Sequence, residues 1–284
     1  MAAAFRLASV RAGPGGRCTG HLVVRLNSEE FHGNPLAPSP AGGYLLKAVL
    51  MAPPGGASLR GRRVSVLVEA AVETVAGALL AEREGAGRLE LCSDLPRGGT
   101  SPGAGLLRAV RSRLDLPLHV MIRPRPGDFH FSTAEREAMI WDVAEAKRAG
   151  ADGVVIGLLA EDGLVDREWT ARLVKLARPL AVTFHRAVDA TPEIGVAVDT
   201  LASLGVDRVL TSGGGATAIQ GLKVLGSLVR EFNDRIGIMP GGQIRAGNVD
   251  RIVKSTGAKE VHVGLPAEAE PERVAGVVAA LDGR

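Results

Sequence analysis

Acidic, basic and imidazole side chains occur at or near the ends of several strand-like runs, where they could transfer protons. Glu69 closes one apolar run, Glu90 lies within a second, and Arg123 and His185 follow two others. A buried carboxylate is unfavourable unless it is paired or neutralised, so we expect the two acids to form one polar network with the arginine and the histidine. Glu69, Glu90 and His185 are therefore candidate general acids or bases. The alternative is a solvated rim of surface charges.

The segment 119–129 changes from strand-like to cationic. Alternation along the strand places His119 and Arg123 on one face, and the prolines at 124 and 126 hold Arg123 and Arg125 in an extended conformation. Guanidinium groups in a fixed geometry bind carboxylates and phosphates well. We therefore predict that Arg123 and Arg125 clamp an anionic ligand, whereas His119, at the start of its strand, is expected to be a hydrogen-bonded core residue.

Two glycine-rich stretches, 211–215 and 240–243, each follow a strand-like run and precede a helical pattern. Backbone N–H groups at such turns and at helix N-termini make anion sites. The alternative is that the glycines only permit tight turns between a strand and a helix. Together with the arginines, the predicted ligand-binding residues are Arg123, Arg125, Arg186, Asp189, Ser212, Gly213, Gly214, Gly241 and Gly242.

Cys92 could be a soft metal ligand or a nucleophile, and it could equally be a small buried hydrophobe. The chain has only two cysteines, Cys18 and Cys92, which give no disulfide framework and fit a reducing compartment. Met121 and Met239 also lie near strand ends, where we expect them to fill the core.

Eight strand-like runs alternate with eight helical patterns from residue 64 onward. The strands are predicted at Val64–Glu69, Arg88–Cys92, Leu118–Ile122, Gly153–Leu158, Leu180–Phe184, Arg208–Thr211, Ile236–Met239 and Glu260–Gly264. Eight such units are typical of an α/β fold of the (β/α)8 TIM-barrel type, and no Gly-x-Gly-x-x-Gly motif follows the first strand to favour a dinucleotide-binding sheet. Barrel active sites lie at the carboxyl ends of the strands, so the candidate residues should converge on one mouth.

The first 63 residues differ from the rest in composition. They contain Gly/Pro/Ala clusters without a sustained period, and they carry eight Lys/Arg but only two acids. We predict a largely disordered N-terminal extension at 1–63, followed by the barrel at 64–284. The extension superficially resembles a transit peptide, and it could instead be a dispensable upstream stretch with translation starting at Met51.

The net charge of +3 belongs to this extension, because residues 64–284 carry 26 basic and 29 acidic residues. Aromatic residues make up only 3% of the chain, which disfavours a stacking platform for nucleic acid. No apolar run approaches the roughly 18 residues of a membrane span. We therefore expect a soluble protein that binds neither nucleic acid nor a membrane.

Several stretches together resemble the CutC family of copper homeostasis proteins. They are Arg88–Ser93, Gly98–Pro102, His119–Arg125, Gly150–Val155, Val182–Asp189, Leu210–Gly214 and Ile238–Gly242. The resemblance implies a cytoplasmic TIM barrel, a homodimer or larger homo-oligomer, and Cu(I) binding through cysteine. Cu(I) prefers soft sulfur ligands, so the implied binding is chemically consistent.

The chain departs from the family pattern at Ala71, where the resemblance implies a cysteine in the first strand. Cys92 is then the one matching candidate ligand for Cu(I). Two hypotheses follow. The first is a copper-homeostasis protein that binds Cu(I) with Cys92, and the second is a barrel enzyme that acts on a small anionic or phosphorylated metabolite held by the arginines.

Overall fold

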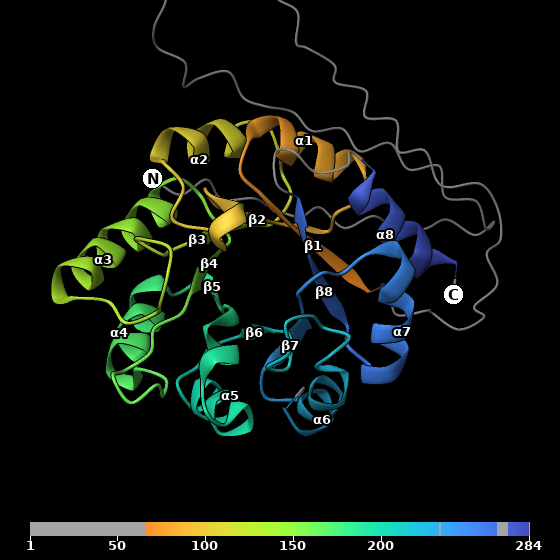
Figure 1. Cartoon of the computed structure of the whole chain (residues 1–284). Helices are drawn as coiled ribbons and strands as arrows, with labels where there is room; N and C mark the ends of the chain where they lie inside the picture. Colours follow the sequence, from red (N-terminus) through yellow and green to blue (C-terminus); the bar gives the residue numbers. More distant parts are fainter. Residues whose placement is uncertain (1–65, 233, 266–271, 284) are drawn as a thin grey trace, which may run out of the picture. The chain divides into compact units, whose positions relative to one another are not determined.

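A computed structural model describes residues 66–232, 234–265 and 272–283 of this chain. The predicted extension, residues 1–63, lies outside these ranges. The described residues form eight strands that alternate with eight α-helices, together with two short 3-10 helices. The predicted TIM barrel is therefore confirmed (Figure 1).

The eight strands of the described ranges form one parallel sheet. Their bounds are β1 Leu67–Val72, β2 Arg88–Leu91, β3 Leu118–Met121, β4 Gly153–Ile156, β5 Ala181–Phe184, β6 Arg208–Thr211, β7 Gly237–Pro240 and β8 Glu260–Leu265. The hydrogen-bonded order is β7-β6-β5-β4-β3-β2-β1-β8. The two edge strands, β7 and β8, lie side by side, so the sheet curls into a barrel (Figure 1).

The helices form a ring around the strands (Figure 1). Their bounds are α1 Val75–Arg83, α2 Ala104–Arg111, α3 Thr133–Arg148, α4 Arg167–Ala177, α5 Ile194–Ser203, α6 Leu222–Phe232, α7 Ala246–Thr256 and α8 Arg273–Asp282, with 3-10 helices η1 Leu95–Arg97 and η2 Arg186–Ala190. Several helix starts are fixed by side chains: Thr74 and Asp166 accept hydrogen bonds from first-turn N–H groups, and Ser132 forms a capping box with Glu135. None of the helices in the described ranges is long and apolar enough to cross a bilayer.

The two faces of the sheet differ in polarity. Outward-facing residues such as Val120, Val154 and Phe184 are buried in one apolar cluster with helix residues such as Met139 and Leu173. Side chains alternate along a strand, so the intervening residues point into the barrel. There, charged and imidazole groups replace the usual branched aliphatic layers.

The first strand differs from its prediction. The sequence places it at Val64–Glu69, but β1 runs from Leu67 to Val72, so Glu69 lies in the middle of the strand and not at its carboxyl end. Ala70 and Ala71 continue the strand because both are fully buried and paired with β2 and β8. Tertiary packing thus overrides the weak strand propensity of alanine, and Glu69 lies deeper in the barrel than predicted.

Candidate functional site

Four charged side chains form an ion-pair layer inside the barrel. Arg88 donates through Nε to Glu69 and through Nη2 to Glu260 at 2.7 Å, while Arg208 Nε lies 2.6 Å from the other oxygen of Glu260. Arg88, Arg208 and Glu260 each begin a strand, so the layer lies toward the amino-terminal end of the barrel. Because an unpaired charge is costly in the interior, this pairing offsets the cost of burying the four groups, and it leaves Oε1 of Glu69 for contacts on its other side.

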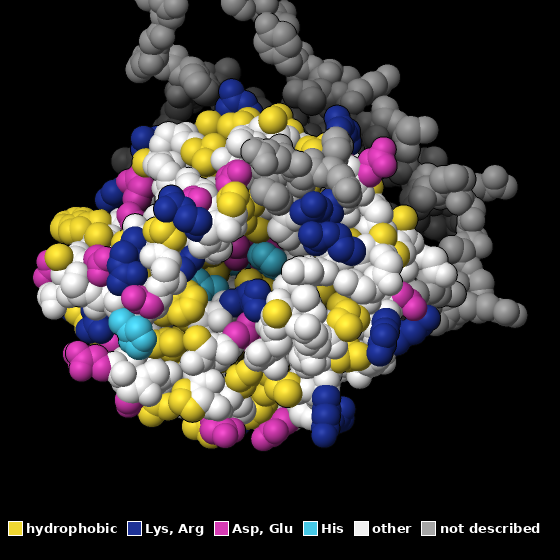
Figure 2. Space-filling view, viewed as in Figure 1, with side chains coloured by type: hydrophobic (Ala, Val, Ile, Leu, Met, Phe, Trp, Pro, Cys, Tyr) yellow, Lys and Arg dark blue, Asp and Glu magenta, His cyan; other side chains and the backbone are white. Residues whose placement is uncertain are grey.

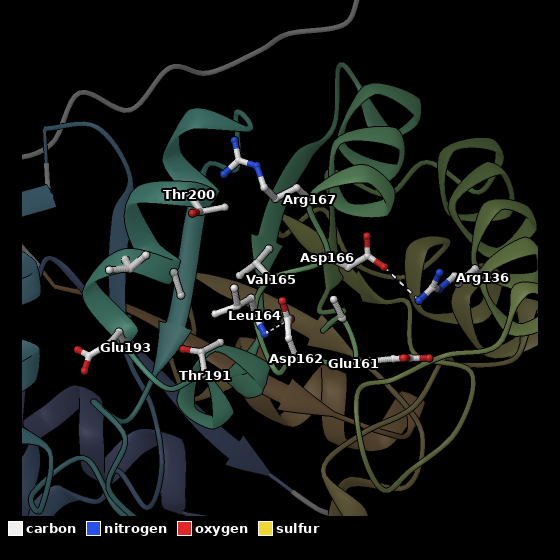
Figure 3. A pocket seen from close by; sticks show the side chains of 13 residues that line it. Arg136, Glu161, Asp162, Leu164, Val165, Asp166, Arg167, Thr191, Glu193 and Thr200 are labelled. Atoms are coloured by element: carbon white, nitrogen blue, oxygen red, sulfur yellow. Dashed lines mark hydrogen bonds and ion pairs between the residues drawn. The ribbon is translucent and has the colours of Figure 1, made fainter.

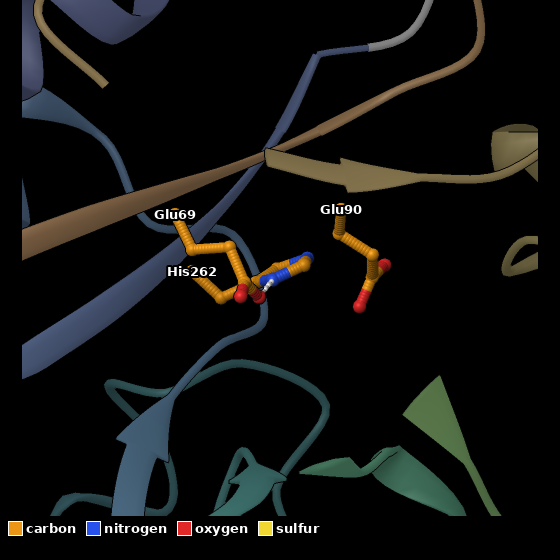
Figure 4. Close-up of side chains that lie close together, drawn as sticks. All are labelled: Glu69, Glu90 and His262. Atoms are coloured by element: carbon orange, nitrogen blue, oxygen red, sulfur yellow. Dashed lines mark hydrogen bonds and ion pairs between the residues drawn. The ribbon is translucent and has the colours of Figure 1, made fainter. Parts of the chain in front are cut away.

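Glu69, a member of this layer, also lies close to Glu90 and His262 (Figure 4). Glu69 Oε1 is 2.8 Å from His262 Nδ1, and the two residues are register partners on β1 and β8. Glu90 comes from the neighbouring strand β2 and is only 2% exposed. Within the described part of the chain, its Oε2 atom has no hydrogen-bond partner. The structure therefore brings Glu69 and Glu90 together, as predicted, but pairs Glu69 with a histidine that was not among the candidates.

Burial and mutual charge shift the protonation of this cluster. Burial raises the pKa of Glu90 to about 7, although the charge of His262 opposes the rise. Burial alone would lower the pKa of His262, but the carboxylates of Glu90 and Glu69 raise it above its ordinary value. Burial likewise acts to raise the pKa of Glu69, yet the hydrogen bond from His262 and the charge of Arg88 hold it below its ordinary value. Glu69 is therefore the ionised member, and Glu90, with its pKa of about 7, is the group of this cluster that can exchange a proton near neutral pH.

His185 lies at the carboxyl end of β5, with its ring over β4. A Cβ on Gly157 would overlap this ring, so the glycine leaves the space that the histidine occupies. The backbone N–H of Ala187 donates to His185 Nδ1 at 3.1 Å, which places the ring hydrogen on Nε2. That Nε2 atom is buried and lacks a hydrogen-bond partner among the described residues. Burial and the nearby charge of Arg123 lower the pKa of His185 to about 3, so the ring is neutral.

Arg123 follows β3 and is 4% exposed. It donates to the backbone carbonyls of Gly99 at 3.0 Å and Gly127 at 2.8 Å, and its guanidinium stacks on Phe129 at 5.0 Å. The remaining donor, Nε, is buried and has no acceptor in the described ranges. Arg123 therefore holds two loops together while keeping one donor unused.

Arg125 has a different environment from Arg123. Its side chain is 35% exposed and forms ion pairs with Glu135 at 2.6 Å and Asp128 at 2.9 Å, and it stacks on Phe131. All these partners lie in the loop after β3 or in α3. The two predicted clamp arginines therefore both lie beside Gly127, but Arg125 is paired with acids whereas Arg123 is bound to backbone carbonyls.

Asp189 is the centre of a saturated network after β5 and β6. It accepts hydrogen bonds from Thr211 Oγ1 and from the backbone N–H groups of Ser212 and Gly214, and it pairs with Arg186 Nε at 2.8 Å. Arg186 also donates to Ser212 Oγ at 2.7 Å. The residues predicted around this turn therefore do meet, but their N–H groups bind the carboxylate of the protein itself. An external anion would have to compete with Asp189 for them.

The glycines at 213, 241 and 242 serve close packing in the structure. A Cβ on Gly213 would lie 2.6 Å from the carbonyl oxygen of Gly221, and one on Gly241 would overlap Leu210. Gly242 has a φ angle of +98°, a backbone conformation that residues other than glycine rarely adopt. These contacts favour the alternative interpretation of the glycines, that they permit tight turns between a strand and a helix, over an anion site.

Cys92 lies in a small buried cluster with Met121 and Val155 near the mouth of the barrel. Its Sγ atom is 3.6 Å from the carbonyl oxygen of Val72. Burial raises the pKa of the Cys92 thiol above its ordinary value. Met121 Cε and Cys92 Sγ both lie within 3.5 Å of the point where a Cβ on Gly99 would be, so the two sulfur-bearing side chains are neighbours.

The space-filling view shows a hollow at the centre of the face seen along the barrel axis, with histidine, acidic and basic side chains gathered around it (Figure 2). A second concavity of about 480 Å³ lies on the flank of the barrel, beside the loop after β4 and helix α5 (Figure 3). Leu164 and Val196 line it, together with the ion pair of Arg136 and Asp166. None of the residues predicted from the sequence lines this groove.

Four members of the interior network were not among the residues predicted from the sequence: Arg88, Arg208, Glu260 and His262. A signal was present, because alternation places Arg88 on the same face as Glu90, and Glu260 on the same face as His262. Two polar residues at this spacing in one predicted strand indicate a polar barrel interior.

Comparison with known proteins agrees with this fold and these motifs. The model of the CutC family matches residues 66–266. The copper homeostasis protein cutC homologs of Mus musculus and Homo sapiens are 48% and 47% identical to the chain over 196 residues, which is 69% of the chain and 72% of each relative. A CutC crystal structure from Streptococcus agalactiae superimposes with a TM-score of 0.67 at 32% identity, covering 70% of this chain and 98% of that one. The chain therefore belongs to the CutC family of copper homeostasis proteins.

Proposed function

We propose that this chain takes part in copper homeostasis by binding Cu(I) at Cys92 and Met121. The observation that carries the proposal is the neighbouring thiol and thioether inside the barrel. Cu(I) prefers soft thiolate and thioether donors, and a copper role accords with the names of the mammalian relatives.

The two sulfur donors, the thiol of Cys92 and the thioether of Met121, are of the type that Cu(I) prefers, but only one of them is a thiol. Ala71 contributes no sulfur, so the thioether of Met121 has to replace the second thiol that the family resemblance implies. Because burial raises the pKa of the Cys92 thiol, the metal must displace a proton that is held firmly. The affinity for Cu(I) should therefore rise with pH.

Anaerobic titration calorimetry with Cu(I) tests this proposal. Wild type should bind one equivalent more tightly than about micromolar, which corresponds to roughly 8 kcal/mol. Cys92→Ser should abolish binding and Met121→Leu should weaken it, whereas Met139→Leu, a buried methionine of α3 outside the barrel interior, should not. Unchanged affinity in Cys92→Ser, or no binding by wild type, would refute the proposal.

A second candidate function has its own supporting observation: His185 Nε2 and Arg123 Nε are buried donors that lack an acceptor among the described residues. Both side chains contact the ring of Phe129: the His185 ring centroid is 5.2 Å and the Arg123 Cζ atom 5.0 Å from its centroid. Adjacent unsatisfied donors favour a small anionic ligand such as a phosphate or a carboxylate. The chain would then be an enzyme for a small anionic metabolite, with Glu90 as a candidate acid or base.

A thermal-shift screen with inorganic phosphate and a set of phosphorylated and carboxylic metabolites tests this second function. A ligand at a hundredfold excess over its dissociation constant should stabilise wild type by about 2.7 kcal/mol. Arg123→Lys and His185→Asn should lose the shift, and Arg125→Ala, on the same loop but facing its own acids, should keep it. A ligand that stabilises all variants equally would contradict the assignment of the site to Arg123 and His185.

The cytoplasmic location and the homo-oligomeric state of this chain remain predictions.

A further inference from the structure

Glu69, Glu90 and His262 extend into the barrel from three neighbouring strands. Each offers one donor atom, and these three atoms all lie within 4.8 Å of one another. Figure 4 shows the Glu90 carboxylate and the His262 ring directed toward the same space. Strands of a closed sheet are rigid, so donors placed on them are held more firmly than donors on loops.

Glu90 has a buried carboxylate oxygen without a partner. The residue is 2% exposed, and in the described ranges Oε2 receives no hydrogen bond. A buried acceptor without a partner is unfavourable, so a donor or cation placed in this space would recover that free energy. The unpartnered oxygen therefore points to a missing electropositive partner.

The charges inside the barrel agree with this conclusion. Among the described residues of the interior network there are three carboxylates, on Glu69, Glu90 and Glu260, but only two guanidinium groups, on Arg88 and Arg208. One negative charge is left over. A proton on the cluster can compensate it, and so can a metal cation.

We propose that Glu69, Glu90 and His262 form a binding site for a divalent cation of the Zn²⁺ class. Two carboxylates and one imidazole suit Zn²⁺ and similar borderline metals, and three protein ligands leave a coordination position open for water or substrate. Arg88 already holds the other oxygen of Glu69 and so orients this ligand from outside the coordination sphere. Tetrahedral coordination needs donor atoms about 3.4 Å apart, so Glu90 would move closer to His262, while Glu69 Oε1 and His262 Nδ1 would exchange their 2.8 Å contact for bonds to the metal.

This site differs from the sulfur pair in the chemistry of its donors. Cys92 and Met121 offer soft sulfur, whereas the cluster offers oxygen and nitrogen. Cu(I) would prefer the first and Zn²⁺ is well suited to the second. The two proposals are therefore independent, and each can fail without the other.

Titration of the metal-free full chain with Zn²⁺ tests the site. Wild type should bind one equivalent with a dissociation constant of about micromolar or lower. Glu90→Gln should bind at least tenfold more weakly, and His262→Gln should do the same. Cys92→Ser should bind as wild type does, and so should His130→Ala, which removes an exposed histidine that could bind Zn²⁺ adventitiously. Circular dichroism and the melting temperature of each metal-free variant show whether it is folded.

Loading with Co²⁺ gives a second readout that does not depend on activity. The visible spectrum should lack a thiolate-to-metal charge-transfer band and should be the same in wild type and Cys92→Ser. The proposal is overturned if wild type binds no Zn²⁺. It is equally overturned if a folded Glu90→Gln protein binds within twofold of wild type, or if Cys92→Ser is the variant that loses the metal.

Discussion

Asp189 is partly buried and Glu90 is buried, and their carboxylates, at different places around the barrel, have opposite environments. Asp189, after β5, receives hydrogen bonds from a hydroxyl and two backbone N–H groups and also pairs with Arg186. Glu90, on β2, has an oxygen that receives none within the described residues. A carboxylate whose oxygens are all hydrogen-bonded, such as that of Asp189, holds the loops at the mouth of the barrel together. A carboxylate with an oxygen that lacks a partner, such as that of Glu90, is available to a ligand. Substitutions on the two sides should therefore have opposite consequences for stability.

The largest effect is expected for Asp189→Asn. The amide removes the ion pair with Arg186 and places an NH2 group against N–H donors, so the free energy of unfolding should fall by about 2–4 kcal/mol. Urea denaturation followed by circular dichroism measures it. The matched control is Asp199→Asn, which breaks an exposed pair with Arg235 and should change stability by less than about 1 kcal/mol. If both variants lose an equally small amount of unfolding free energy, the hydrogen-bond network around Asp189 does not contribute to stability.

Gly157→Ala should have the next largest effect. The added methyl overlaps the ring of His185, so either the ring or β4 must move, at about 1–3 kcal/mol. Gly195→Ala is the control, because a Cβ there meets nothing within 4 Å and alanine favours the α5 helix. Denaturant midpoints should fall for the first variant and stay or rise for the second. A wild-type midpoint in Gly157→Ala would mean that the ring is not confined.

The same contrast explains what the sequence could predict. The alternation of strands and helices gave the barrel, because period and count are local properties of the chain. The positions of Glu90 within the second strand and of His185 directly after the fifth were predicted for the same reason. The position of Glu69 was not predictable in this way, since the continuation of β1 through Ala70 and Ala71 depends on pairing with β2 and β8.

The saturation of Asp189 also lay beyond local patterns. Apart from Arg186, its hydrogen-bond donors come from a turn 22 to 25 residues away, and a glycine-rich turn predicts exposed N–H groups without showing what they bind. Similarly, the pairing of Glu69 with His262 spans 193 residues. Such contacts form only when the barrel closes. It was therefore easier to predict which residues lie in the site than which of them bind to each other.

His185 is intermediate in its hydrogen bonding: Nδ1 accepts a hydrogen bond, whereas Nε2 has no partner among the described residues. Its folded pKa of about 3 lies below the ordinary 6.5, so between these values the unfolded chain binds the extra proton. The stability it contributes is present above pH 6.5 and is lost as pH falls, by about 1.4 kcal/mol per pH unit. His185→Gln should flatten the slope of stability against pH between 4.5 and 6.5 by that amount, and His130→Gln, at an exposed position, should not. Parallel slopes in wild type and His185→Gln would show that the ring titrates normally.

The smallest effect on stability is expected for Glu90→Gln in the metal-free protein, and it is the sharpest test of the comparison. The amide has nearly the shape of the carboxyl group, and Oε2 has no hydrogen bond among the described residues that could be lost. The unfolding free energy should therefore stay within about 0.5 kcal/mol of wild type or rise, because the excess negative charge of the interior is removed. Denaturation at neutral pH after chelation measures it beside Asp189→Asn. A loss as large as that of Asp189→Asn would mean that Glu90 is saturated by partners after all, and the distinction between the two sides of the barrel would no longer hold.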